Sequence, residues 1–144
     1  MQYNQDEKRK IIMNHYLKPE NLNKDLNEID NITRYGETCG DTLNIDLEIK
    51  NETIKNISFN GQGCAIFISA TDILINLLKN KNISEVKNII EIYHNLIDGK
   101  DLNIEELVKI GELAIYNNID KSESRKRCAK MASELILQQI KNAK

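Results

Sequence analysis

The sequence predicts an α+β fold, a small three-stranded antiparallel sheet packed with about five helices. The first observation is the alternation of apolar and polar residues over 42–50, TLNIDLEIK, which is typical of a strand with one buried face. The second is the helical spacing of apolar residues before residue 19 and after residue 64. Helices that precede and follow a group of strands, without alternating with them, favour an α+β architecture.

The N-terminal half contains the first expected helix and all the expected strands. Residues 6–18 have helical spacing, and Pro19, the only proline of the chain, ends that helix. Residues 20–31 are polar and are expected to form a loop. Residues 32–35, ITRY, predict a short edge strand, and the strands 42–50 and 53–60 are expected to form a hairpin around a tight turn.

Four more helices are expected in the C-terminal half. Residues 65–79 are apolar on most sides and predict a buried helix. Ser84 is the expected N-cap of the next helix, and Asn103 is the expected N-cap of a third, which ends at Asn117. The last helix is expected to begin at residues 122–124.

Length and composition are those of one globular domain, residues 1–144. Hydrophobic residues make up 40% and charged residues 29% of the chain, and the net charge of −2 argues against nucleic-acid binding. The first residues lack the apolar stretch of a signal peptide, and no apolar run is long enough to span a membrane. We therefore expect a cytoplasmic protein with no membrane partner.

Three cysteines stand where expected elements meet. Cys39 lies in the glycine-flanked loop GETCGD, Cys64 follows GQG at the start of a helix, and Cys128 lies in the first turn of the last helix. Exposed N–H groups at a helix N-terminus stabilise a thiolate, which is the form that binds metal ions. With the carboxylate of Asp41, three thiolates could complete a tetrahedral zinc site. Three core cysteines and a turn-forming Asp41 are the alternative that the long spacings leave open.

The cysteine motifs resemble those of a known family. TCGD at 38–41, GQGC at 61–64 and RKRCA at 125–129 are similar, in this order, to the three motifs of the SufU/IscU/NifU-N iron–sulfur assembly family. IIMNHYLKPEN at 11–21 resembles the first helix of that family, and the resemblance extends over about residues 6–140.

Two features resemble the SufU branch of this family. Arg127 stands directly before the third cysteine, where IscU-type scaffolds carry a histidine, and the segment between the second and third cysteines is long. The chain departs from the family at Gly36-Glu37, where Asn-Pro is usual, and in AIFISAT after Cys64, where the family is rich in serine.

The resemblance implies a zinc-dependent sulfurtransferase of iron–sulfur cluster assembly. Cys39, Asp41, Cys64 and Cys128 would be the zinc ligands, and Arg125 would support the site. Cys39 would accept persulfide sulfur from a SufS-type cysteine desulfurase, and SufB-type scaffold proteins are further partners that the resemblance allows. Because four ligands close a tetrahedral zinc site, Cys39 would have to leave the metal during sulfur transfer.

Two other functions stay open for the same residues. In an IscU/NifU-type scaffold, the thiolates would hold a [2Fe–2S] cluster. In a non-catalytic adaptor, zinc would only stabilise the fold. Iron with acid-labile sulfide would indicate the scaffold, and zinc without sulfur transfer would indicate the adaptor.

The two histidines are not expected to bind metal. His15 shares a helix face with Ile11 and Ile12, which predicts a core or interface contact. His94 is expected to be a partly exposed helix residue.

Overall fold

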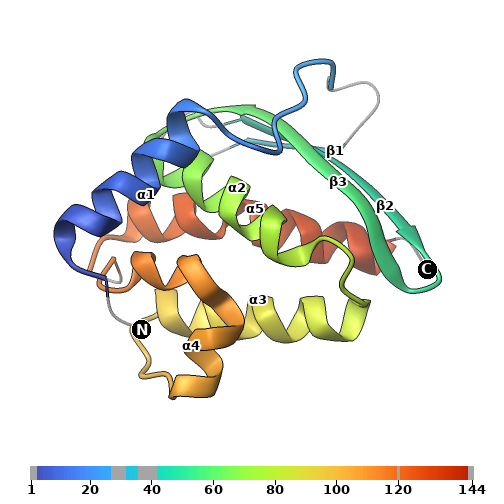
Figure 1. Ribbon diagram of the computed structural model, residues 1–144. Coiled ribbons are helices and arrows are strands. Elements are labelled where there is room, and N and C mark those ends of the chain that lie inside the picture. Colours follow the sequence, from blue (N-terminus) through green and yellow to red (C-terminus); the bar gives the residue numbers. More distant parts are fainter. Residues whose placement is uncertain (1–2, 27–31, 36–41, 120, 143–144) are drawn as a thin grey trace.

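The computed structural model describes residues 3–26, 32–35, 42–119 and 121–142. One helix comes first in the chain, the strands follow, and the remaining helices come last, as the sequence predicts (Figure 1). The elements are α1 (Gln5–Leu17), β1 (Ile32–Tyr35), β2 (Thr42–Lys50), β3 (Thr53–Gln62), α2 (Ala65–Leu78), α3 (Ile83–Ile97), α4 (Ile104–Ile110), the 3-10 helix η1 (Gly111–Tyr116) and α5 (Glu123–Asn142).

β2 and β3 form a long antiparallel hairpin, which confirms the prediction from the alternating residues. Asn51 and Glu52 have φ angles of 54° and 59°, the left-handed values that a two-residue hairpin turn requires. At the open end of the hairpin, Thr42 pairs with Gln62. The face of the hairpin that meets the helices carries the buried residues Leu43, Ile45, Ile54, Ile57 and Phe59.

The prediction of a three-stranded sheet needs a correction. The sheet consists mainly of two antiparallel strands, β2 with nine residues and β3 with ten. β1 adds only four residues along the first part of β2, from the pair Ile32–Ile45 to the pair Tyr35–Thr42. A segment this short makes few ladder hydrogen bonds, so the hairpin and the helices beneath it carry most of the packing. The α+β class and the five α-helices agree with the sequence.

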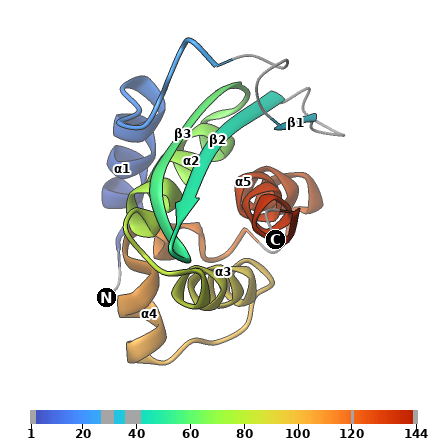
Figure 2. The same ribbon diagram turned by 90° about the vertical axis from the view of Figure 1, so that its right-hand side faces the viewer.

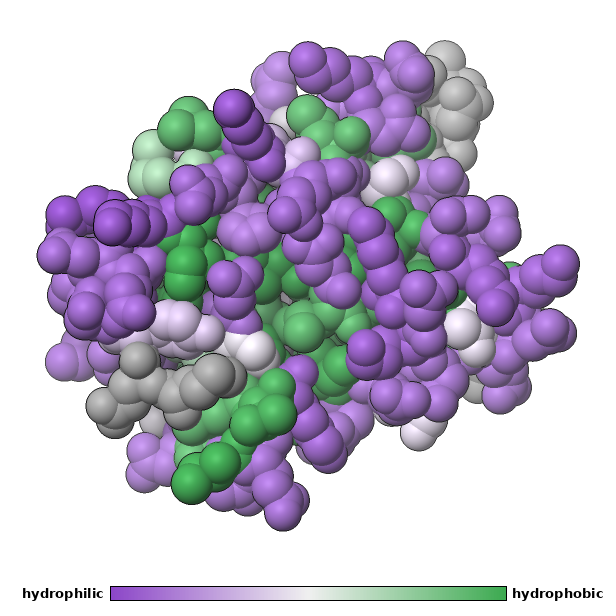
Figure 3. Space-filling view, in the orientation of Figure 1, coloured by the Kyte–Doolittle hydropathy of each residue, from purple (hydrophilic) through white to green (hydrophobic). Residues whose placement is uncertain are grey.

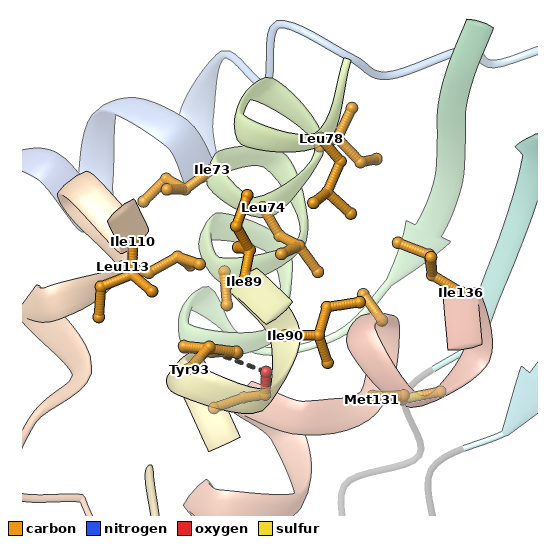
Figure 4. Close-up of a cluster of buried hydrophobic side chains, with 14 of the residues drawn as sticks. Ile73, Leu74, Leu78, Ile89, Ile90, Tyr93, Ile110, Leu113, Met131 and Ile136 are labelled. Atoms are coloured by element: carbon orange, nitrogen blue, oxygen red, sulfur yellow. Dashed lines mark hydrogen bonds between the residues drawn. The ribbon is translucent and has the colours of Figure 1, made fainter. Parts of the chain in front are cut away.

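The hydrophobic core lies where the helices meet the hairpin. α2 packs against α1, α5, η1 and β3, and α3 packs against α4, η1 and α5 (Figure 2). Ten side chains of α2 are buried, as expected for a helix that is apolar on most sides. The core shown in Figure 4 gathers side chains from α2, α3, α5 and the α4–η1 segment, among them Ile73, Leu74, Ile90, Leu113 and Ile136.

Several helix ends differ from the prediction. Asn82, not Ser84, caps α3, because its side chain accepts a hydrogen bond from the Glu85 N–H. The expected third helix breaks at Gly111, whose φ of 50° ends α4 before the chain continues as η1. α5 begins at Glu123, within the expected residues 122–124, but Cys128 then lies in its second turn and not in its first. None of the helices in the described part of the chain is long and apolar enough to cross a membrane.

Candidate metal centre

Cys64 lies where β3 passes into α2. It is the N-cap of α2, and its Sγ accepts a hydrogen bond from the Phe67 N–H at 3.5 Å. The side chain is exposed. An exposed sulfur at the start of a helix is accessible to a metal ion, and the sequence predicts this position for Cys64.

The strand pairing brings Tyr35 and Thr42, the described residues on either side of the segment 36–41, to the end of the hairpin next to Cys64. Cys39 and Asp41 themselves lie outside the described residues. Tyr35 and Thr42, which flank this segment, pair with each other. Thr42 also pairs with Gln62, which is two residues before Cys64. Tyr35, where β1 ends, and Thr42, where β2 begins, therefore lie at the end of the sheet from which the chain continues to Cys64.

Cys128 and Arg125 lie on α5, next to the first turns of α2. Cys128 is buried, with 5% of its surface exposed, and α5 packs along α2. Arg125 is exposed and lines a surface hollow of about 370 Å³ together with Ile66, which is two residues after Cys64. The N-terminal ends of α2 and α5 thus meet at one place on the surface.

These positions fit a metal ion bound by soft ligands. The described chain contributes two sulfur donors, Cys64 and Cys128, and thiolates are preferred ligands of zinc and of iron–sulfur clusters. Within the described residues, no group of three or more His, Cys, Asp or Glu side chains gathers around a possible metal position. A four-ligand site therefore depends on Cys39 and Asp41, whose segment begins and ends beside this place.

A polar contact lies in the core behind the first turn of α2. The Ser69 hydroxyl donates to the Ala65 carbonyl at 2.6 Å and lies 2.5 Å from the Tyr116 hydroxyl. Burial raises the pKa of Tyr116 above its ordinary value against the opposing effect of the Ser69 hydrogen bond, and the charges of Glu112, Cys64 and Asp72 raise it further. Tyr116 is thus a neutral donor or acceptor near the base of the candidate site.

The sequence analysis missed a buried carboxylate, Asp72, in the middle of α2. Asp72 is fully buried and accepts hydrogen bonds from the backbone N–H groups of Glu20 and Asn21 at 3.0 and 2.8 Å. The Asn21 side-chain amide donates to it at 2.9 Å, and His15 Nδ1 lies 2.6 Å from Asp72 Oδ2. The signal was present: one acidic residue stands inside the mostly apolar stretch ATDILINLL.

The two histidines make structural contacts. His15 lies between Asp72 and Glu112, with Nε2 3.4 Å from Glu112 Oε1, which confirms the expected interface contact. His94 on α3 lies 2.7 Å from the Ser133 hydroxyl, which itself donates to a backbone carbonyl and therefore accepts from His94 Nε2–H. Burial, with help from Lys130 and against the charge of Asp98, lowers the pKa of His94 from 6.5 to about 4.

Comparison with known proteins points to one family. The family described as NifU-like N terminal domain matches residues 7–99. The zinc-dependent sulfurtransferase SufU of Bacillus subtilis (strain 168) is 23% identical, over 86% of this chain and 82% of that protein. The iron–sulfur cluster assembly scaffold protein IscU of Streptococcus pyogenes serotype M1 is 20% identical, over 92% of this chain and 82% of that protein.

The fold is also similar to that of a solved structure. A protein from Fervidobacterium islandicum AW-1, described as a candidate iron–sulfur cluster assembly scaffold for the SUF system, superposes with a TM-score of 0.78. It is 18% identical in sequence, and the match covers 94% of each chain. At this identity the similarity supports the architecture of hairpin and helices.

Proposed function

Because this chain belongs to the NifU-like N-terminal domain family, we propose that it acts in iron–sulfur cluster assembly as a zinc-dependent sulfurtransferase. Similarity to a protein named zinc-dependent sulfurtransferase SufU, over most of both chains, supports this activity. The proposal treats residues 1–144 as one domain and takes a SufS-type cysteine desulfurase as the sulfur donor. SufB-type scaffold proteins are the proposed acceptors of the sulfur.

The pairing of Thr42 with both Tyr35 and Gln62 is the observation that carries the proposal. It supports a site in which residues from the segment 36–41 and Cys64 act together, although they are far apart in sequence. Sulfur transfer needs this convergence, because an attacking thiolate and the groups that hold it must occupy one surface. The convergence depends on the hairpin register, which the buried faces of β2 and β3 determine.

We propose Cys39, Asp41, Cys64 and Cys128 as the zinc ligands. Three sulfur donors and one carboxylate match the donor types and the number of ligands of a tetrahedral zinc site. When bound, zinc would keep the thiols deprotonated near neutral pH and would hold the loop in place. Arg125 supplies positive charge one helical turn before Cys128, which favours the approach of an anionic group.

Cys39 is the proposed sulfur acceptor. Its thiolate attacks the outer sulfur of a cysteine persulfide on the desulfurase. A new S–S bond forms between Cys39 and that sulfur, while the S–S bond of the desulfurase persulfide breaks and its cysteine leaves as a thiolate. One sulfur atom changes carrier without net oxidation or reduction.

A [2Fe–2S] scaffold is the second candidate, because the chain is also similar to proteins named IscU scaffolds. Arg127 favours the sulfurtransferase, since IscU-type scaffolds resemble this chain but carry a histidine at that position. A cationic side chain repels metal ions and is not a ligand, so this position offers no donor to a cluster.

The test is stimulation of the desulfurase. Purified desulfurase is assayed for alanine formation from cysteine, alone and with wild-type protein, Cys39→Ser or the control Asn56→Ser on the exposed side of β3. We expect Cys39→Ser to abolish the stimulation while its circular dichroism stays native, and the control to match the wild type. Full stimulation by Cys39→Ser would show that Cys39 is not the acceptor.

A further inference from the structure

α1 has one apolar face turned to the solvent. Met13, Tyr16 and Leu17 are 38%, 39% and 67% exposed, and they form what we call the α1 strip. Ile11 and Ile12 of the same helix pack against the core, so the strip is not needed to attach α1 to the rest of the fold. Figure 3 shows hydrophobic surface over the C-terminal half of α1, at the upper left, and hydrophilic surface over its N-terminal half.

Two surface hollows connect the α1 strip to the surroundings of Cys64. Tyr16 and Leu17 line a hollow of about 450 Å³ that also includes Gly63, the residue before Cys64. Met13 lines the hollow of about 370 Å³ that includes Ile66, two residues after Cys64. A partner that covers the strip would therefore also cover the approach to the candidate metal centre.

The end of the strip nearer to Arg125 is positively charged. Lys8, Arg9 and Arg125 line the 370 Å³ hollow, and none of its lining residues is acidic. Arg9 contacts Asp6 only at 4.0 Å, and both side chains are more than three-quarters exposed, so this pair does little to neutralise the arginine. Lys8 is held by a hydrogen bond from its Nζ to Asn117 Oδ1 at 2.6 Å, which leaves its charge in place.

We propose that the α1 strip and its cationic end are the docking surface for the persulfide-donating desulfurase. The partner segment would place apolar side chains on Met13, Tyr16 and Leu17 and at least one carboxylate opposite Arg9. Continuity with the approach to Cys64 selects this occupant, because the sulfur donor has to reach that site. This inference rests on the proposed function and adds the surface by which the partner is recognised.

The energetics favour such a surface. Aromatic residues, methionine and arginine are enriched in the cores of protein interfaces. The exposed part of Leu17, by contrast, does not contribute to the stability of the isolated fold, because it stays in contact with water. The cationic end adds steering of an acidic partner, which raises the association rate more than the final affinity. Substitutions in the apolar part should therefore mainly change the dissociation rate, and substitutions at the cationic end should mainly change the association rate.

The test measures binding of the desulfurase encoded in the same genome, by biolayer interferometry. Leu17→Asp should raise the Kd at least about 10-fold, mainly through faster dissociation. Arg9→Glu should slow association, and the difference from wild type should shrink as salt is added. Val108→Asp is the matched control, because Val108 on α4 is 60% exposed and lies outside both hollows.

The outcomes separate this inference from the proposed function. If the wild-type protein binds and stimulates the desulfurase and Leu17→Asp does so equally well, the docking surface is wrong and the function stands. If the wild type neither binds nor stimulates the desulfurase, both proposals fail. Sedimentation of this chain without the desulfurase tests a different occupant. If the wild type is a dimer and Leu17→Asp dissociates it, the α1 strip binds a second copy of the chain, and the inference is overturned.

Discussion

Gly61 on β3 lies so close to Thr42 on β2 that a Cβ atom at position 61 would stand 2.6 Å from the Thr42 carbonyl oxygen. That oxygen belongs to backbone that cannot move freely, because Thr42 is paired on one side with Tyr35 and on the other with Gln62. The first glycine of GQGC therefore serves the close approach of the strands at the end of the sheet where the segment 36–41 begins and ends.

Gly61→Ala should destabilise the protein by about 1–3 kcal/mol, because the new methyl group forces the two strands apart. Urea unfolding followed by circular dichroism measures the change. Gln62→Ala is the control, since Gln62 is the exposed next residue of the same strand, and it should change the free energy of unfolding by less than about 0.5 kcal/mol. Equal effects of the two substitutions would contradict this role of Gly61.

Metal analysis should find about one zinc ion per chain in protein purified anaerobically without chelator. Asp41→Ala and serine substitutions at Cys39, Cys64 and Cys128 should each lower the zinc content, because removing one of four ligands opens the site. Mass spectrometry of the metals gives both zinc and iron. Iron with acid-labile sulfide in place of zinc would put the cluster scaffold ahead of the sulfurtransferase.

Asp72→Ala should cost about 3 kcal/mol of unfolding free energy, because it leaves several buried donors and His15 without their acceptor. Asp98→Ala is a suitable control. Asp98 pairs with Lys126 and Lys130 at the surface, and its side chain is 37% exposed, so its removal should cost less than about 1 kcal/mol. The measurement is urea unfolding at pH 7, and a cost for Asp72→Ala as small as that of Asp98→Ala would argue against the network.

Stability should fall as the pH drops from about 6.5 to about 4 because of His94. The folded pKa of His94 is lowered from 6.5 to about 4, so in this range the unfolded chain binds a proton that the folded chain does not. By linkage, the free energy of unfolding then decreases with decreasing pH and levels off for this group below the folded pKa.

His94→Gln removes this titration and should flatten the profile. Because His94 is partly exposed, we expect the wild type to lose only about 1–2 kcal/mol more than His94→Gln between pH 7 and 4.5. Urea midpoints at several pH values give the comparison, and carboxylates titrate alike in both proteins. Parallel profiles would mean that His94 is protonated in the folded protein at these pH values.

Local patterns in the sequence determined most of the secondary structure. Alternating residues placed β2, and the tight turn after it placed β3 as the returning strand. Helical spacing placed α1, α2 and α3 within a few residues, because side-chain period follows directly from backbone geometry. The order of the three cysteine motifs indicated the family, and the family match over residues 7–99 agrees with it. The roles of Cys39, Asp41, Cys64, Cys128 and Arg125 stay predictions.

The exact ends of the helices could not be read from the local sequence pattern, because several residues compete to cap or end each helix. Asn82 displaced Ser84 as the cap of α3, and the break at Gly111 moved the end of α4. The start of α5 at Glu123 lies within the expected residues 122–124, but Cys128 lies in its second turn and not in its first. Helix ends are decided by which of several polar side chains reaches the free N–H groups, and this depends on packing.

The sequence by itself determined the residues available for chemistry: three cysteines, one nearby carboxylate, and glycines at the strand end. Only the tertiary structure decided which of them are neighbours, because the strand register pairs Thr42 with Gln62 and so brings residues distant in the chain to one edge. It likewise turned Asp72 into a buried acceptor for His15 and left the apolar face of α1 in solvent. A polar group inside a helix and an apolar face outside it acquire a role only through what packs against them.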